Sequence, residues 1–183
     1  IVSSNNSGSD DPSVPNLQAM KAIYDDALSR FSVLKQRLYA TGLSGGARVA
    51  CDMGYKYRGQ VAGVIGCGAG FPIDTAPSKD TPFAFYETIG NLDFNYYEIR
   101  LLRPKLEASS IPYKIHIFDG EHWWPPKEVA TEALEWMEVQ AMKNAKREKD
   151  AALIETLFQK RLKKVESQKA EGMMVEAAEE YQS

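Results

Sequence analysis

The chain has 183 residues, of which 44% are hydrophobic and 26% are charged. This composition is typical of a globular protein and supplies enough apolar side chains for one domain with a sizeable core. The formal net charge of -3 gives no reason to expect nucleic acid or an anionic membrane as a partner, because those ligands need a basic surface. No apolar run approaches the roughly 20 residues of a membrane-spanning helix, and two cysteines are too few for a disulfide scaffold.

The chain does not begin with Met, and its first letters, IVSS, read like the end of a strand already under way. We interpret it as a fragment or a processed chain. A signal peptide would lie upstream of such a start, so the compartment stays open, with secretion or export to the periplasm among the possibilities.

Strand and helix patterns alternate through the first three quarters of the chain. Helices are indicated by apolar residues three and four positions apart, and strands by short runs of β-branched and aromatic residues. In chain order we expect a loop over 3–16, a helix over 17–31, a strand over 37–41, a helix from 44, strands over 61–66 and 82–89, a helix over 96–108 interrupted or weakened near Pro104, a strand over 113–118 and a helix opened by Pro125 and Pro126. This alternation predicts an α/β fold, with a mainly parallel sheet and helices on both faces. Active sites of such sheets lie at the carboxyl ends of the strands.

The pattern changes near residue 140, which predicts a hydrolase-type domain over 1–139 and a helical extension over 140–183. The extension has an apolar helical stripe, a break at Gly172 and a second short helix, which together predict a helical hairpin. The spacing of Gly172, Glu176, Ala177 and Tyr181 faintly resembles one helix of a tetratricopeptide repeat. A solvated amphipathic extension is the alternative. A protein partner would bind through these helices, and their mixed charges do not suggest nucleic acid.

The letters GLSGG at residues 42–46 fit the pattern G-x-S-x-G. This pattern places a serine, here Ser44, on a tight strand-to-helix turn that exposes its hydroxyl at the end of the sheet. We expect a side chain in place of either Gly42 or Gly46 to clash where strand and helix meet. The backbone N–H of Gly45 is then the expected first donor to an oxyanion. An ordinary glycine-rich turn is the alternative.

A serine hydroxyl becomes a useful nucleophile when a neighbouring base takes its proton. The sequence has two histidines. His116 lies inside an apolar strand pattern, where we expect a packed strand residue. His122 follows that strand, at the place where the base of such a hydrolase belongs. Its alternative role is a loop histidine stacked near two tryptophans.

The third member of a triad is a carboxylate that orients the imidazole, expected between Ser44 and His122 in the chain. Asp93 follows the strand over 82–89 and fits this place. Asp119 and Glu121 are competitors, but they are close to His122 in sequence and cannot easily reach its far side. Glu87 would lie inside the strand.

Aromatic residues flank the acid and the base. Phe94, Trp123 and Trp124 either form an apolar substrate pocket or cover the core, and both interpretations are open. Arg48, one turn after Ser44, is expected to be a solvated helix residue rather than an anion clamp.

Three segments in this order, LYATGLSGGARVA, ETIGNLDFNYYEIRLL and YKIHIFDGEHWWPP, resemble the dienelactone-hydrolase-like and phospholipase/carboxylesterase-like branch of the α/β-hydrolase superfamily. The resemblance covers roughly residues 1–138. It implies a serine hydrolase with Ser44 as nucleophile, Asp93 as orienting acid and His122 as general base. It also implies a small-molecule ester substrate and neither a metal nor an organic cofactor.

The resemblance is incomplete at its start, because such folds carry earlier strands and a loop with the second oxyanion donor. Asn5 and Asn6 are only remote substitutes, and losing one donor typically costs about a hundredfold in rate. Whether these 183 residues are active by themselves is therefore left open. Two rival functions remain: a non-catalytic hydrolase-fold scaffold with a helical interaction module, and a serine peptidase that uses the same triad.

Overall fold

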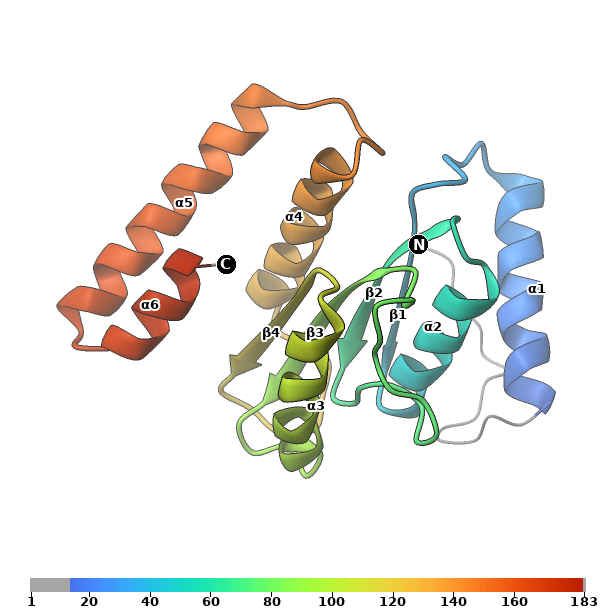
Figure 1. Ribbon diagram of the computed structural model, residues 1–183, viewed down its shortest axis with the longest axis horizontal. Helices are drawn as coiled ribbons and strands as arrows, with labels where there is room; N and C mark the ends of the chain where they lie inside the picture. Colours follow the sequence, from blue (N-terminus) through green and yellow to red (C-terminus); the bar gives the residue numbers. More distant parts are fainter. Residues whose placement is uncertain (1–13, 183) are drawn as a thin grey trace. The chain divides into compact units, whose positions relative to one another are not determined.

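A computed structural model describes residues 14–182 of the chain (Figure 1). The chain divides into two compact units between Met137 and Glu138. The strands are β1 (Leu38–Leu43), β2 (Val61–Cys67), β3 (Ala84–Gly90) and β4 (Tyr113–Phe118). The helices are α1 (Val14–Arg30), α2 (Gly45–Lys56), α3 (Tyr96–Ser109), α4 (Lys127–Lys143), α5 (Ala151–Ala170) and α6 (Met174–Gln182).

The four strands form one parallel sheet in the order β1-β2-β3-β4. The α/β fold predicted from the alternating pattern is confirmed. Because neighbouring strands run in the same direction, all four carboxyl ends meet at one edge of the sheet. Leu43 pairs with Cys67 at the end of β1, and Gly90 pairs with Phe118 at the end of β4. This edge is where the residues that follow the strands come together.

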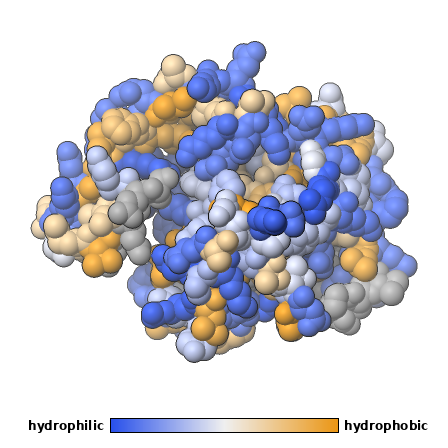
Figure 2. All heavy atoms as spheres, in the orientation of Figure 1, coloured by the Kyte–Doolittle hydropathy of each residue, from blue (hydrophilic) through white to orange (hydrophobic). Residues whose placement is uncertain are grey.

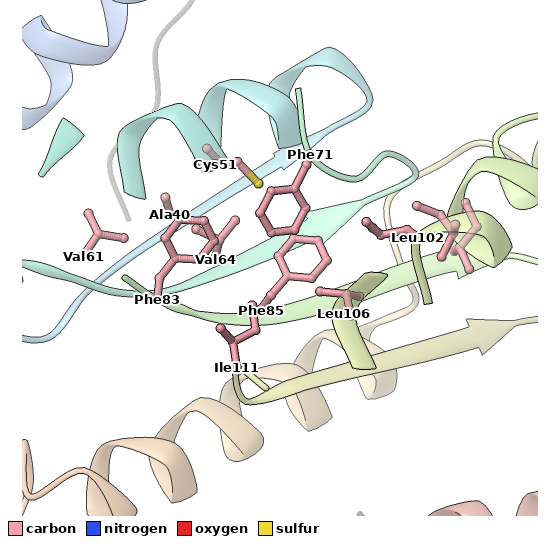
Figure 3. Close-up of a cluster of buried hydrophobic side chains, with 13 residues drawn as sticks. Ala40, Cys51, Val61, Val64, Phe71, Phe83, Phe85, Leu102, Leu106 and Ile111 are labelled. Carbon is pink, nitrogen blue, oxygen red and sulfur yellow. The ribbon is translucent and has the colours of Figure 1, made fainter. Parts of the chain in front are cut away.

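Helices cover both faces of the sheet, as expected for a parallel sheet. Helices α2 and α3 supply core residues on one face, and α4 supplies Ala133, Trp136 and Met137 on the other. The α2–α3 face contains a cluster of aromatic rings, in which Phe71 and Phe85 lie 4.8 Å apart between ring centroids (Figure 3). The sheet edge that carries the loops is therefore supported by a packed core on each side.

Two helices differ clearly from the sequence-based expectation. Helix α1 begins at Val14 rather than at residue 17, because Pro15 is compatible with the first turn of a helix, where its missing N–H is not needed. Helix α3 runs through Pro104 without interruption. Pro104 removes a hydrogen bond to the carbonyl of Arg100, and both residues lie on the exposed side of the helix, where water can replace that bond.

The second unit contains the helical hairpin. Asp150 caps α5 by accepting a 3.0 Å hydrogen bond from the Leu153 N–H, and Gly172 turns the chain between α5 and α6 with a left-handed φ of 80°. Leu157 of α5 and Ala177 of α6 are among its buried residues. The predicted break at Gly172 is thus where the hairpin turns.

Hydrophilic residues cover most of the face drawn in Figure 2, with hydrophobic residues scattered among them. Within residues 14–182, no helix combines the length and the apolar character that a membrane span requires.

Candidate active site

Ser44 occupies the corner between β1 and α2, directly before the first helical residue. Its backbone has φ 55° and ψ -126°, a conformation that a residue with a side chain rarely adopts. The Ser44 N–H donates a 2.8 Å hydrogen bond to the carbonyl of Cys67 at the end of β2. Residues kept in such strained conformations are concentrated at functional sites, and a serine on a strained strand-to-helix turn is what the G-x-S-x-G pattern predicts.

The two flanking glycines have different reasons to be glycine. A β-carbon on Gly42 would lie 2.2 Å from the backbone of Gly46, so only glycine fits where strand and helix meet. A β-carbon on Gly46 would meet nothing within 4 Å. The expected clash is therefore found at Gly42, and the expectation was wrong for Gly46.

Gly45 is the first residue of α2 and is buried. The first N–H groups of a helix have no carbonyl partner within the helix and bear the positive end of its dipole. The Gly45 N–H therefore remains a candidate oxyanion donor beside the Ser44 hydroxyl.

Backbone hydrogen bonds join the loops that follow β3 and β4. Asn91 N–H donates to the carbonyl of Phe118, and Leu92 N–H donates to the carbonyl of Gly120, both at 2.9 Å. The backbones come so close that a β-carbon on Gly90 would lie 2.2 Å from the Gly120 carbonyl oxygen. This close approach brings the Asp93 loop against the His122 loop.

Asp93 and His122 form an acid–imidazole pair at the carboxyl edge of the sheet. His122 Nδ1 lies 2.9 Å from Asp93 Oδ1 and 2.8 Å from Oδ2. The Asp93 side chain is 1% exposed, and its Oδ1 also accepts a 2.7 Å hydrogen bond from the Asn95 N–H. A buried carboxylate on Nδ1 fixes the tautomer and leaves Nε2 as the ring nitrogen available for proton transfer.

Ser44 is linked to this pair through the backbone that follows β2. Cys67 accepts the Ser44 N–H, and the next residue, Gly68, lies against the acid and the imidazole: a β-carbon there would be 3.0 Å from Asp93 Oδ2 and 3.1 Å from His122 Nδ1. Among the described residues, the Ser44 hydroxyl makes no hydrogen bond to His122. Such contacts are often long in enzymes without substrate and tighten when substrate binds.

The competing carboxylates have other surroundings. Asp119 Oδ1 accepts a 3.1 Å hydrogen bond from Asn91 Nδ2, which fastens the two loops together. Glu121 is exposed, and Glu87 is fully buried inside β3. The second histidine, His116, lies in β4 as expected, with its Nδ1 3.2 Å from Glu132 Oε2.

The flanking aromatic residues lie on the surface rather than in a closed pocket. Phe94 is 75% exposed and packs on His122 with ring centroids 4.1 Å apart. Trp123 and Trp124 are also exposed. A cavity of about 260 Å³ lies elsewhere, between α3 and the chain after β2, and its lining includes Arg48 and Glu98 but none of the three aromatics.

Arg48 is not the solvated residue that the sequence suggested. Its guanidinium forms two hydrogen bonds with Glu98, of 2.9 and 2.7 Å, and a third of 2.7 Å with the carbonyl of Phe71. The side chain is 17% exposed. Arg48 therefore joins α2, α3 and the chain after β2 beside the candidate site.

Gly68 and Asn95 were missed by the sequence analysis. Gly68 has a left-handed φ of 70°, and Asn95 Nδ2 donates a 2.8 Å hydrogen bond to its carbonyl. The sequence did offer a signal for Gly68, because a glycine directly after a buried strand indicates a turn or a close backbone approach. Asn5 and Asn6 lie outside the described residues. Residues 14–182 contain no group of three His, Cys, Asp or Glu side chains placed to hold a metal ion.

Several solved structures with the same architecture are hydrolases or esterases. S-formylglutathione hydrolase FrmB of Staphylococcus aureus matches 66% of this chain and 59% of its own at 17% identity, with a TM-score of 0.53. A carboxylesterase of Bacillus cereus matches 69% of this chain and 62% of its own at 20% identity and a TM-score of 0.51. SOBER1 of Arabidopsis thaliana matches 73% and 67% at 18% identity, also with a TM-score of 0.51.

The fold is that of an α/β-hydrolase. At these identities the matches establish the fold alone. The chain spans about six-tenths of the length of the first two proteins. No protein-family model matches the sequence, and no curated protein does.

Proposed function

We propose that this α/β-hydrolase chain is part of a serine hydrolase that cleaves carboxylic esters through an acyl-enzyme. Ser44 is the nucleophile, His122 the general base and Asp93 the acid that orients it. The observation that carries the proposal is the contact of His122 Nδ1 with both oxygens of the buried Asp93, next to a serine on a strained turn. The esterases among the structures with the same fold support the choice of reaction class.

In the first half of the reaction, Ser44 Oγ attacks the ester carbonyl while His122 Nε2 takes the hydroxyl proton. The carbonyl oxygen becomes an oxyanion, which the Gly45 N–H stabilises from the start of α2. His122 then gives the proton to the leaving alcohol, and the acyl group remains on Ser44. Asp93 stabilises the imidazolium that exists between these two proton transfers.

In the second half, water attacks the acyl-enzyme and gives its proton to His122. The tetrahedral intermediate collapses, the carboxylic acid leaves and Ser44 regains its proton from His122. The chemistry needs no metal or organic cofactor. One donor at the oxyanion comes from the described residues, and the second is expected from outside them.

Turnover of p-nitrophenyl acetate and butyrate by the intact protein tests this proposal. Ser44→Ala removes the nucleophile and should abolish turnover, whereas Ser29→Ala removes an exposed hydroxyl of α1 and serves as the control. Activity retained by Ser44→Ala at the level of that control would refute the assignment. Cleavage of a peptide p-nitroanilide but of neither ester would favour the peptidase alternative with the same triad.

A non-catalytic scaffold is the rival function, and exposed apolar residues on the α5–α6 hairpin favour it. Phe158, Val175 and Tyr181 are each more than half exposed, and exposed apolar side chains on a helical hairpin can bind a partner. In that case the intact protein would hydrolyse no ester, and substitution of these residues would weaken a protein complex. Binding of a partner by the hairpin is itself compatible with ester hydrolysis by the first unit.

A further inference from the structure

Glu87 lies in the middle of an otherwise apolar sheet face. Phe85 and Ile89, two residues before and after it in β3, point to the same side and belong to the core cluster under α2 and α3. Glu87 is 0% exposed. Removing a carboxyl group from water into such surroundings is costly unless partners compensate for the lost hydration. Its position in the core is therefore not explained by packing alone.

The carboxyl group fits into a space left by a glycine in the next strand. Gly66 is the register partner of Glu87, and a β-carbon on Gly66 would lie 2.2 Å from Glu87 Oε2 and 3.0 Å from the carbonyl oxygen of Ala69. The backbone N–H groups of Gly68 and Ala69 are close enough to the carboxyl group to lower its pKa, which opposes the effect of burial. Neither carboxyl oxygen has a hydrogen-bond partner of ordinary geometry within the described residues. Buried polar groups without partners are rare in native proteins and point to a function.

Residues 67–69, the segment next to the carboxyl group, contact all three members of the proposed triad. Cys67 accepts the Ser44 N–H, and Gly68 lies against Asp93 and His122. The segment has its own fixed contacts, because the Gly68 N–H donates to the carbonyl of Thr88 at 2.9 Å. A displacement of this segment would therefore move the serine and the acid–imidazole pair relative to one another.

The elements around Glu87 bring several charged and titratable groups near its carboxyl group. Burial raises the pKa of Glu87 well above the ordinary value, and repulsion from Glu98 of α3 and from Asp93 raises it further. Cys51 of α2 and Cys67 of β2 are thiols whose own pKa values burial also raises. Arg48 of α2 forms its ion pair with Glu98. On the neighbouring strand β4, the residue that pairs with Glu87 is Ile115, which carries no charge.

We propose that Glu87 is a positioning residue. Its buried carboxyl group packs against the backbone of residues 67–69, holds this segment in place and so keeps Ser44 aligned with the Asp93–His122 pair. The inference rests on the proposed function, because alignment matters only if the three residues act together. It also accounts for an acid in the core, which a protein selected for stability alone would replace with an apolar residue.

Two variants separate positioning from packing. Glu87→Gln keeps the size of the side chain and an acceptor oxygen near the Gly68 and Ala69 N–H groups. Glu87→Met keeps an unbranched side chain of similar length but removes its polar atoms. In the intact protein, we expect Glu87→Met to lower kcat for p-nitrophenyl butyrate about tenfold with little change in KM. Glu87→Gln should restore most of that loss. Glu121→Gln, which removes an exposed carboxylate next to His122, is the control for a change of charge.

Urea unfolding at pH 6 and pH 8 tests the buried neutral acid without using activity. Between the ordinary carboxyl pKa and the raised pKa of Glu87 in the folded state, the folded state holds more protons than the unfolded state, so raising the pH destabilises the wild type. The folding equilibrium constant of the wild type should fall by up to tenfold per pH unit relative to Glu87→Met and Glu87→Gln. Glu121→Gln should follow the wild type. Equal pH slopes for the wild type and both Glu87 variants would overturn the proposal.

A low-field proton resonance from His122 Nδ1–H reports the hydrogen bond between His122 and Asp93, which residues 67–69 also contact, even if the protein hydrolyses no ester. We expect Glu87→Met to shift or broaden this resonance and Glu87→Gln to preserve it. If Glu87→Met leaves both the resonance and kcat unchanged, Glu87 does not position the site. If Ser44→Ala retains turnover, the proposed function fails instead, and the unfolding and resonance measurements still decide the role of Glu87.

Discussion

The two histidines provide a comparison within one domain. Each has a carboxylate near Nδ1, at 2.8 Å in the Asp93–His122 pair and at 3.2 Å in the Glu132–His116 pair. Their imidazole side chains are similarly covered, with 19% and 16% exposed. By distance and histidine burial alone, either pair could be the base and acid of a hydrolase.

The carboxylates and their places in the fold are what differ. Asp93 is 1% exposed and is held by the Asn95 N–H, whereas the Glu132 side chain is 24% exposed on helix α4. His116 lies within β4 and shares its Nδ1 with the Tyr86 hydroxyl, 3.3 Å away. His122 lies past the end of the strand, at the edge that also carries Ser44. We therefore expect the Asp93–His122 pair, with its immobilised carboxylate at the carboxyl edge, to be the functional one.

The largest expected difference is between removing the two imidazoles. His122→Ala should lower kcat/KM for p-nitrophenyl butyrate by about 10⁵-fold, because Ser44 loses the base that takes its proton. His116→Ala should change it by less than about fivefold. Esterase assays on the intact protein measure both. Equal losses would mean that the edge position of His122 has no special role.

A smaller difference is expected between the two carboxylates. Asp93→Asn should lower kcat by about 10⁴-fold, because an amide in place of the carboxylate favours the wrong tautomer of His122. Glu132→Gln should have a minor effect on kcat, since its partner lies outside the proposed site. A comparable loss of kcat in Glu132→Gln would contradict this assignment, provided that both variants unfold at similar urea concentrations.

The smallest of these effects concerns the backbone beside the acid–imidazole pair. Gly68→Ala places a methyl group 3.0 Å from Asp93 Oδ2 in a left-handed backbone, and we expect a ten- to hundredfold loss of kcat with about 1–3 kcal/mol of destabilisation. Gly59→Ala is the matched control, because Gly59 also has a positive φ but open space around it. It should lose about 1 kcal/mol of stability and no activity. If both variants lost kcat equally, the close approach of Gly68 would not explain the effect.

Much of the fold could be predicted because its signals are local. The strand over 113–118 has both ends where its run of β-formers predicts them, and the turn at Ser44 follows from glycines within two residues of it. The exceptions are also local in origin: α1 extends to Val14 because Pro15 suits a first turn, and α3 continues through Pro104 on its exposed side.

The site could be predicted only where a residue's role follows from its place after a strand. Asp93 and His122 follow β3 and β4, so the parallel order of the sheet brings them to one edge. Arg48 and Glu98 are far apart in sequence, and nothing in the composition of either helix indicates their pair. Glu87 reads as an ordinary strand residue until the glycine opposite it, Gly66, is known from the strand register.

The central claim is that the Asp93–His122 pair activates Ser44, and labelling by a fluorophosphonate probe tests it most directly. We predict that the probe modifies the intact wild-type protein covalently on Ser44, and peptide mass spectrometry would identify the modified residue. His122→Ala should abolish this modification, and His116→Ala should not. A wild type that leaves Ser44 unmodified, or a His122→Ala variant that is labelled as fast as the wild type, would contradict the account.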